Sequence, residues 1–158
     1  MDGRTTIFDY WGVPEHQKWM NGGAFDGGLL SDEQKQVRQF YSDLLNLAQK
    51  NRAIVTGSYH DITDVNILEK NFGTDVHAFI RNEGAERLLI LTSFNAKAKE
   101  VTVRIPEEVA KSIGLEQNKK YIGRDLLWNE VEIELQNDFS VTLTLKPYSS
   151  FIFKIKES

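Results

Sequence analysis

The acidic residues of this sequence are the first candidates for chemistry, because two carboxylates that flank one glycosidic bond can hydrolyse it. Asp9, Glu15 and Asp26 are the acids that lie in an aromatic-rich setting. Nothing in their spacing pairs any two of them. Most other acids lie on the expected outer faces of strands or at helix starts, where contact with solvent accounts for them. The sequence therefore predicts no catalytic residue.

The side chains that could bind a metal ion are also poorly arranged. His16, His60 and His77 have no i, i+4 pairing and no other ligand spacing. The acidic and amide residues of 61–66 do not match a calcium loop, which requires a glycine at its centre, and we interpret them as an Asx-rich turn. The chain contains no cysteine, so disulfides and thiolate sites are excluded. We predict no metal site and no cofactor.

The composition limits the partners that the chain can bind. Its 158 residues include 19 basic and 23 acidic side chains, with a formal net charge of −4 and no basic stripe. A nucleic-acid-binding surface is therefore not expected. No apolar run approaches the roughly 18 residues of a membrane-spanning helix, and the N-terminal sequence lacks the charged and apolar regions of a signal segment. We expect a soluble chain with no membrane partner.

The first 30 residues are rich in aromatic side chains and glycine. Glycine costs roughly 1 kcal/mol per site in a helix relative to alanine, so residues 1–30 are predicted to form an irregular segment held by large side chains. Tyr10, Trp11 and Trp19 have flat faces on which sugar rings can stack, but such side chains more commonly bury against the rest of the protein. Composition alone favours burial.

Residues 31–50 carry the clearest helix signal. Ser31 and Gln34 have the spacing of a capping box, and the acidic residues after Ser31 suit the positive end of the helix dipole. One apolar face recurs with helical periodicity, formed by Val37, Phe40, Tyr41, Leu44, Leu45 and Ala48. A single amphipathic helix must bury such a face, either against the β-region that follows or against a part of the protein outside this chain.

From residue 51 onward the apolar period changes from 3.6 to 2, which indicates strands. Strand candidates are 53–59, 76–81, 87–94, 101–105, 120–127, 131–136, 139–146 and 151–155, with a short helical turn at 106–113. Residues 61–74 form the clearest loop candidate. About eight short strands with one polar face predict a mainly β fold, an antiparallel Greek-key-type β-sandwich preceded by one amphipathic helix and the irregular segment.

Several strings, in their order along the chain, resemble the C-terminal end of α-amylase-family glycoside hydrolases. They are RTTIFDYW at 4–11, Ser31 with the helix 34–49, Asn51-Arg52-Ala53, Gly57-Ser58-Tyr59, the hairpin-like segments 76–81 and 86–95, and LKPYSSF at 145–151. The resemblance spans nearly the whole chain, and the order of the motifs supports it more than any single motif. The complete (β/α)₈ barrel of that family is excluded by length, since it typically needs about 250 residues.

The resemblance implies three segments and no catalytic machinery. Residues 1–30 resemble the final βα loop of the barrel, residues 31–50 the last barrel helix, and residues 51–158 the C-terminal β-sandwich called domain C. The catalytic carboxylates of the family lie on earlier barrel strands, and no position here matches them. The isolated chain is therefore expected to have no enzyme activity, although its parent would be a glycoside hydrolase.

The resemblance also implies partners. These are the missing N-terminal barrel domain and, through the parent enzyme, an α-glucan or oligosaccharide. Because βα loops face the active site of such barrels, Tyr10, Trp11 and Trp19 become candidate carbohydrate contacts. The apolar face of the helix at 31–50 would pack partly on the barrel, so the isolated chain is expected to expose a patch or to dimerise through that face.

Two other functions fit parts of the sequence. One is an autonomous carbohydrate-binding β-sandwich module, and the other is a β-sandwich interaction domain unrelated to sugars. The aromatic segment suits either carbohydrate function, whereas the helix and the bridge at 51–53 are superfluous in both alternatives. Trp128, the one tryptophan of the β-region, lies at a predicted turn, and its burial is left open by the sequence.

Overall fold

The computed structural model describes residues 13–69 and 71–158. Their contacts divide the chain into two compact units, Met1–Leu45 and Asn46–Ser158, and each is described by itself. The helix α2 (Asp32–Lys50) begins in the first unit and ends in the second. Among the described helices, none is long and apolar enough to cross a membrane.

The first unit contains α1 (Pro14–Met20), the 3-10 turn η1 (Asn21–Gly23) and most of α2. The prediction that residues 1–30 are irregular is therefore wrong over α1. Pro14 suits the first helical turn, where a missing N–H leaves nothing unpaired, and the described glycines of this segment all follow the end of α1. Residues 1–12, which include the candidates Tyr10 and Trp11, lie outside the described residues.

The predicted capping box at the start of α2 is confirmed. The Ser31 amide donates to Oε1 of Gln34 at 3.0 Å, and the Gln34 amide donates to Oγ of Ser31 at 3.2 Å. Asp32 and Glu33 occupy the first turn and Lys50 the last, as the helix dipole favours. These local contacts begin the helix at the residue that the sequence predicts.

The apolar face of α2 is not covered within its own unit. Val37, Tyr41 and Leu45 each remain more than half exposed, and no residue of α2, all of which the structure describes, is fully buried. A contiguous row of large apolar side chains is typical of a surface that contacts another molecule or domain. The described residues of the first unit leave Val37, Tyr41 and Leu45 more than half exposed.

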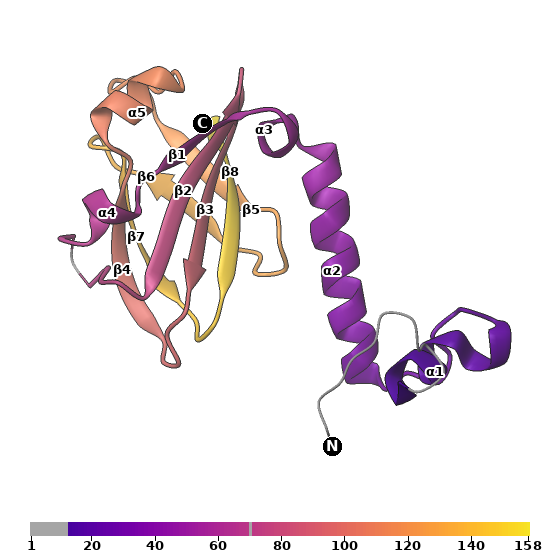
Figure 1. Ribbon diagram of the computed structural model, residues 1–158. Helices are drawn as coiled ribbons and strands as arrows, with labels where there is room; N and C mark the ends of the chain where they lie inside the picture. The colour runs from indigo at the N-terminus through magenta and orange to yellow at the C-terminus, as the bar shows by residue number, and fades with distance from the viewer. Residues whose placement is uncertain (1–12, 70) are drawn as a thin grey trace. The chain divides into compact units, whose positions relative to one another are not determined.

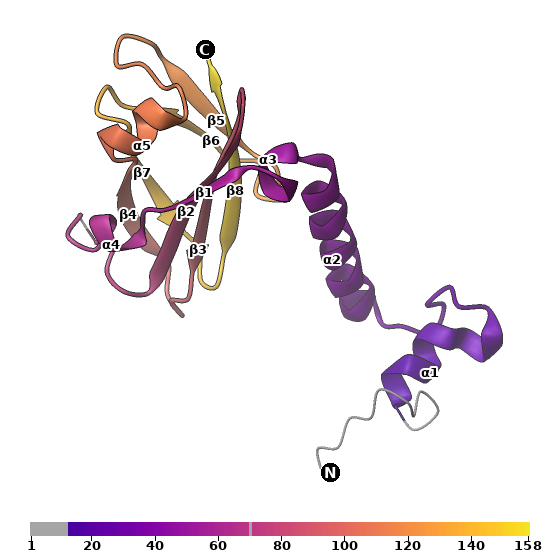
Figure 2. The same cartoon turned by 45° about the horizontal axis from the view of Figure 1, so that its top comes forward.

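The second unit is an antiparallel β-sandwich (Figures 1 and 2). Its described strands are β1 (Ser58–Asp61), β2 (Val76–Glu83), β3 (Glu86–Ser93), β4 (Lys99–Arg104), β5 (Tyr121–Asp125), β6 (Glu132–Leu135), β7 (Ser140–Leu145) and β8 (Ser150–Glu157). Six form one sheet in the order β1-β2-β3-β8-β5-β6, and β4 pairs with β7 in a second sheet. The mainly β fold class that alternation predicts is confirmed, although several helices precede the strands rather than one.

The core lies between the two sheets and is filled by side chains that alternate along the strands. Its members include Val76, Ala78, Ile80, Leu89, Leu91, Val101, Val103, Val141, Leu145, Phe151, Phe153 and Ile155. The rings of Phe151 and Phe153 stack with their centroids 5.4 Å apart. The helical turn predicted at 106–113 is confirmed as α5 (Glu107–Ser112), which contributes Ala110 to the same core.

One predicted strand is wrong. Residues 53–59 are predicted to be one strand. In the structure, residues 53–55 belong to α3 (Arg52–Val55), and only Ser58 and Tyr59 belong to a strand, β1. The β-branched residues of this segment favour a strand, but Arg81 on β2 donates to the carbonyl groups of Ala53 and Ile54 at 3.0 and 2.7 Å. These tertiary contacts hold the segment as a helical turn.

Asp75 links the segment before β2 to the start of β4. Its carboxylate accepts hydrogen bonds from Nδ2 of Asn95 and Nζ of Lys99, and Lys99 also donates to the Phe72 carbonyl at 2.8 Å. The bond from Lys99 is the main cause that holds the pKa of Asp75 below its ordinary value of 3.8. The ionised carboxylate stabilises the fold above that ordinary pKa, and its contribution disappears as the pH falls through the lowered pKa.

We expect Asp75→Asn to lower the free energy of unfolding by about 1 kcal/mol at neutral pH, since the amide keeps the shape but loses the charge. In acid the difference from the native chain should vanish, because native Asp75 is then protonated as well. Urea unfolding over a pH series measures both. Asp64→Asn, at an exposed position of the same unit, is the control. A difference for Asp75→Asn that stays constant with pH would contradict the assignment.

Candidate functional site

Trp19 is the one predicted carbohydrate contact within the described residues. It lies in the last turn of α1 and is partly buried. Its ring meets the ring of Phe25 edge to face, with the centroids 5.6 Å apart. The loop after α1 folds back, and the Gly27 amide donates to the Trp19 carbonyl at 3.0 Å. Trp19 is thus fixed by the loop that follows it, with part of its surface still exposed.

A hollow of about 530 Å³ adjoins Trp19, between α1 and the start of α2. Its lining residues are Glu15, His16, Trp19, Leu30, Glu33, Gln34, Val37 and Arg38. The apolar members can pack against the flat face of a sugar ring, and the carboxylates and guanidinium can form hydrogen bonds with its hydroxyl groups. The volume is in the range of small-molecule sites.

The acids that the sequence singles out have separate roles. Asp26 organises the loop after η1, since its carboxylate accepts Nδ2 of Asn21 at 2.9 Å and the Gly28 amide at 2.8 Å. The bond from Asn21 is the main cause that lowers the pKa of Asp26. Glu15 lines the hollow, whereas Asp26 is not part of its lining. Asp9 lies outside the described residues.

The three histidines lie on different elements. His16 lines the hollow, Nε2 of His60 is 3.1 Å from Oγ of Ser58, and Nδ1 of His77 is 2.8 Å from Oγ1 of Thr63. The described part of the chain contains no group of three or more His, Asp or Glu side chains that could hold a metal ion.

The Asx-rich segment forms the predicted turn and also starts a helix. Oδ1 of Asp61 accepts the Thr63 amide at 2.8 Å, and this bond is the main cause of the lowered pKa of Asp61. The turn leads into α4 (Thr63–Asn66), so the loop predicted at 61–74 is wrong over these four residues. The hydrogen bond from the Thr63 amide to the Asp61 carboxylate places Thr63 at the start of the helical turn.

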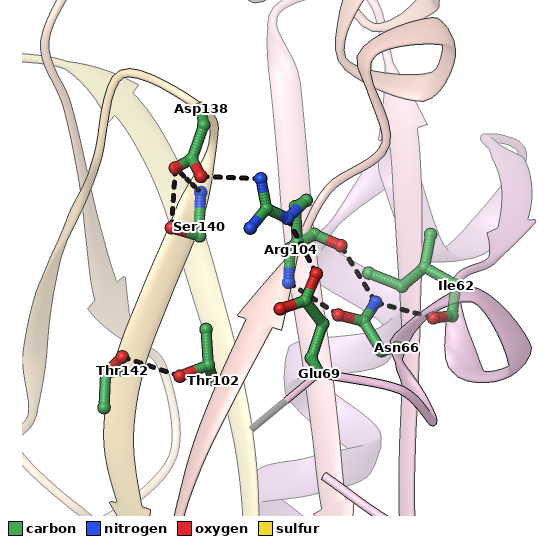
Figure 3. Close-up of polar contacts among 8 residues, drawn as sticks. All are labelled: Ile62, Asn66, Glu69, Thr102, Arg104, Asp138, Ser140 and Thr142. Atoms are coloured by element: carbon green, nitrogen blue, oxygen red, sulfur yellow. Dashed lines mark hydrogen bonds and ion pairs between the residues drawn. The ribbon is translucent and has the colours of Figure 1, made fainter. Parts of the chain in front are cut away.

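Asn66 ties α4 to β4 (Figure 3). Its Oδ1 accepts the Arg104 amide at 2.7 Å, and its Nδ2 donates to the carbonyl groups of Arg104 and Ile62 at 2.9 and 2.7 Å. The side chain is fully buried, and these three bonds satisfy it there. Sequence reasoning assigned Asn66 to the turn alone, because its partner Arg104 lies 38 residues later.

The Arg104 side chain forms a charged cluster at the same place (Figure 3). Its guanidinium donates to Oε1 of Glu69 at 2.8 Å and to Oδ2 of Asp138 at 2.6 Å. The bond to Glu69 is the main cause that raises the pKa of Arg104, and the hydroxyl of Ser140, which donates to Asp138 at 2.6 Å, is the main cause that lowers the pKa of Asp138. Since each charge is opposed, the cluster acts as a structural clamp rather than as an acid–base pair.

Asn66→Ala should lower the free energy of unfolding by about 3 kcal/mol, because it removes the three hydrogen bonds that the fully buried side chain forms with one amide and two carbonyl groups. Urea unfolding should show a lower midpoint with an unchanged slope. Val65→Ala, at an exposed position of the same helix, is the matched control. A loss for Asn66→Ala within about 0.5 kcal/mol, the usual range for surface changes, would refute the role of this side chain.

The chain is similar over part of its length to a curated enzyme. It is 31% identical over 117 residues to the oligo-1,6-glucosidase of Bacillus cereus, and the match covers 74% of this chain and 17% of that enzyme. The chain therefore spans about a sixth of the length of this relative. No family model matches the chain.

Solved structures share the fold. AmyP E221Q in complex with maltotriose aligns with a TM-score of 0.60 and 18% identity, over 84% of this chain and 23% of that chain. An α-amylase from Anoxybacillus aligns with a TM-score of 0.56 and 18% identity, over 85% of this chain and 26% of that chain. At these identities the likeness concerns the fold alone.

The fold and the comparisons define a class of protein region, the C-terminal β-sandwich region of α-amylase-family glycosidases. The chain is a partial match to this class, because it covers only 17–26% of the matched proteins. Within this class the chain is matched in sequence to part of an oligo-1,6-glucosidase. The resemblance that the ordered motifs suggest is therefore confirmed, at the level of a partial match.

Proposed function

We propose that this chain is the non-catalytic C-terminal portion of an α-glucan-active glycoside hydrolase of the α-amylase family, in which it stabilises the barrel domain. The supporting observation is the partial match, in which 31% identity extends over 117 residues that make up 17% of a glucosidase. In this proposal the catalytic carboxylates belong to the remainder of the enzyme. Residues 1–30 follow the last barrel strand, 31–50 correspond to the last barrel helix, and 51–158 to domain C.

The helix α2 supports the stabilising role. Its apolar row of Val37, Tyr41 and Leu45 is more than half exposed among the described residues. Packing this row on neighbouring barrel elements would remove it from water, with a gain of roughly 25 cal/mol per Å² of apolar surface buried. Without a barrel, the same row would stay exposed or pair with a second copy of the chain.

The hollow beside Trp19 supports a contribution to carbohydrate binding. An indole, two carboxylates and a guanidinium line one hollow, and such groups can stack on a sugar ring and form hydrogen bonds with its hydroxyl groups. Tyr10 and Trp11 stay candidate carbohydrate contacts by their position in the sequence, and they lie outside the described residues.

We expect the chain to bind maltooligosaccharides weakly through this hollow, and Trp19→Ala to weaken the binding at least about tenfold by loss of the stacking surface. Titration calorimetry with maltoheptaose measures the affinity. Trp128→Ala removes an exposed indole outside the hollow and is the matched control.

Equal affinity in the native chain and in Trp19→Ala would contradict the contact. Tight binding that survives Trp19→Ala would instead favour an autonomous carbohydrate-binding module.

A replacement experiment tests the function as a whole. With this chain in place of the matched segment, the Bacillus glucosidase should fold and keep its kcat within about tenfold, because the proposal leaves the reacting groups outside this chain. Deletion of the segment without replacement should yield no soluble, active enzyme. An unrelated β-sandwich of similar length is the control insert and should behave like the deletion. If this chain performs no better than the control insert, the proposal fails.

A further inference from the structure

The loop after α1 contains the one Asn-Gly pair of the sequence, Asn21-Gly22. An asparagine that precedes glycine loses its side-chain amide more readily than other asparagines, because glycine has no Cβ to hinder the attack of its backbone nitrogen on the preceding side chain. Every other asparagine of the chain is followed by a residue with a Cβ. One position is therefore singled out for this chemistry, which is deamidation.

The backbone around this pair is open. Asn21 ends α1 with a φ of 45° and a ψ of 54°, a left-handed conformation that asparagine adopts more readily than most residues. Gly22 follows with a φ of 65° and is exposed. Beyond its chain neighbours and its own helical turn, no described atom lies within 4 Å of the place where a Cβ on Gly22 would stand. Water therefore reaches the pair.

The reaction needs only this pair and water. The backbone nitrogen of Gly22 forms a bond to Cγ of Asn21, the bond from Cγ to Nδ2 breaks, and the amide nitrogen leaves as ammonia with the proton that the Gly22 nitrogen gives up. The product is a cyclic imide. Water then opens the imide at either carbonyl, which gives aspartate, or isoaspartate with the main chain running through Cγ. In the balance, one amide and one water become one carboxylic acid and one ammonia.

The Asn21 side chain is held by Asp26. Its Nδ2 donates to Oδ1 of Asp26 at 2.9 Å, and the same oxygen accepts the Gly28 amide at 2.8 Å. The fit is close, because a Cβ on Gly28 would stand 2.5 Å from Nδ2 of Asn21. A carboxylate that accepts a hydrogen bond from an amide restrains its rotation and makes its carbonyl carbon a weaker electrophile. The bond to Asp26 therefore slows the reaction at Asn21.

The same loop contains an Asp-Gly pair, Asp26-Gly27, which can form the same imide with loss of water. Here the glycine is buried, and its amide donates to the Trp19 carbonyl at 3.0 Å. An ionised carboxylate is also a poor electrophile, and the bond from Asn21 lowers the pKa of Asp26. The structure thus favours reaction at Asn21 over reaction at Asp26.

Deamidation replaces a donor by a charge of the wrong sign. The new carboxylate at position 21 would face Oδ1 of Asp26, which the Nδ2 group of Asn21 now approaches to 2.9 Å. Two carboxylates at such a distance repel each other when both are ionised. In the isoaspartate product the main chain also gains a methylene group. Both products therefore break the side-chain bond between the two ends of the loop.

The loop in question holds Trp19. The Phe25 amide donates to the Met20 carbonyl at 2.9 Å, the Gly27 amide donates to the Trp19 carbonyl, and the Phe25 ring meets the indole edge to face. The bond from Asn21 to Asp26 spans the same turn. Since Trp19 lines the hollow between α1 and α2, a change at Asn21 is transmitted to one wall of that hollow.

We propose that Asn21 is a site of spontaneous deamidation, and that its conversion releases the loop that holds Trp19. The reacting groups are the exposed Asn21-Gly22 pair and water, and the bond to Asp26 sets the rate. The inference is independent of the proposed function, because no ligand and no other part of an enzyme enters the reaction.

The native chain itself provides the first test. The chain is incubated in mildly alkaline buffer and digested, and mass spectrometry follows the gain of one dalton at each asparagine. Asn95 is the matched internal reference, since its Nδ2 also donates to an aspartate, Asp75, but alanine follows it. Asn21 should convert at least about tenfold faster than Asn95, because only glycine leaves the attacking nitrogen unhindered.

Two variants separate the steps. Gly22→Ala should slow the conversion of Asn21 at least about fivefold; circular dichroism verifies the helices, since a left-handed alanine costs about 1 kcal/mol. Asp26→Ala should speed the conversion at least about threefold, because it removes the hydrogen bond that restrains the amide. Asp64→Ala, an exposed position of the second unit, is the control and should leave the rate unchanged.

Hydrogen exchange tests the release of the loop. Asn21→Asp creates the product carboxylate directly, and the amides of residues 24–28 should then exchange at least about tenfold faster, while those of β3 stay unchanged.

Each result can overturn a part of the proposal. Conversion of Asn21 no faster than that of Asn95, or unchanged in Gly22→Ala, overturns the site. Equal rates in Asp26→Ala and Asp64→Ala overturn the restraint by Asp26. Unchanged exchange in Asn21→Asp overturns the release of the loop.

Discussion

A sheet whose central strands are apolar on both sides must be covered on both sides, and the second unit is organised around this constraint. The inner face of the six-stranded sheet is covered by β4 and β7, which can therefore present polar side chains to water on their own outer face. The outer face is covered by α3 at one end. The position of α3 and the rising exposure along β3 and β8 are those of an apolar face that is only partly closed within this unit.

The fold was predictable where the decisive contacts are local. Alternation identified the strands, and Ser31 with Gln34 fixed the start of α2 because the capping box acts within four residues. The segment α3 was missed because it depends on Arg81, 27 and 28 residues away from the carbonyl groups that it binds. One signal was readable in advance: Leu88-Leu89-Ile90-Leu91 does not alternate, which is typical of a strand buried on both faces.

The candidate sites also combine features that the sequence predicts with features that depend on long-range contacts. Trp19 could be singled out by residue type, but the hollow beside it required α1, whose existence the nearby glycines obscured. Glu15 and Arg38 line that hollow together although they lie on different helices. Sequence patterns identify residues with suitable chemistry, whereas the neighbours that complete a site come from long-range pairing.

The distribution of polar and apolar groups favours association over catalysis. Several charged side chains of the sandwich form internal pairs, as in the clamp around Arg104, and several large apolar side chains are more than half exposed.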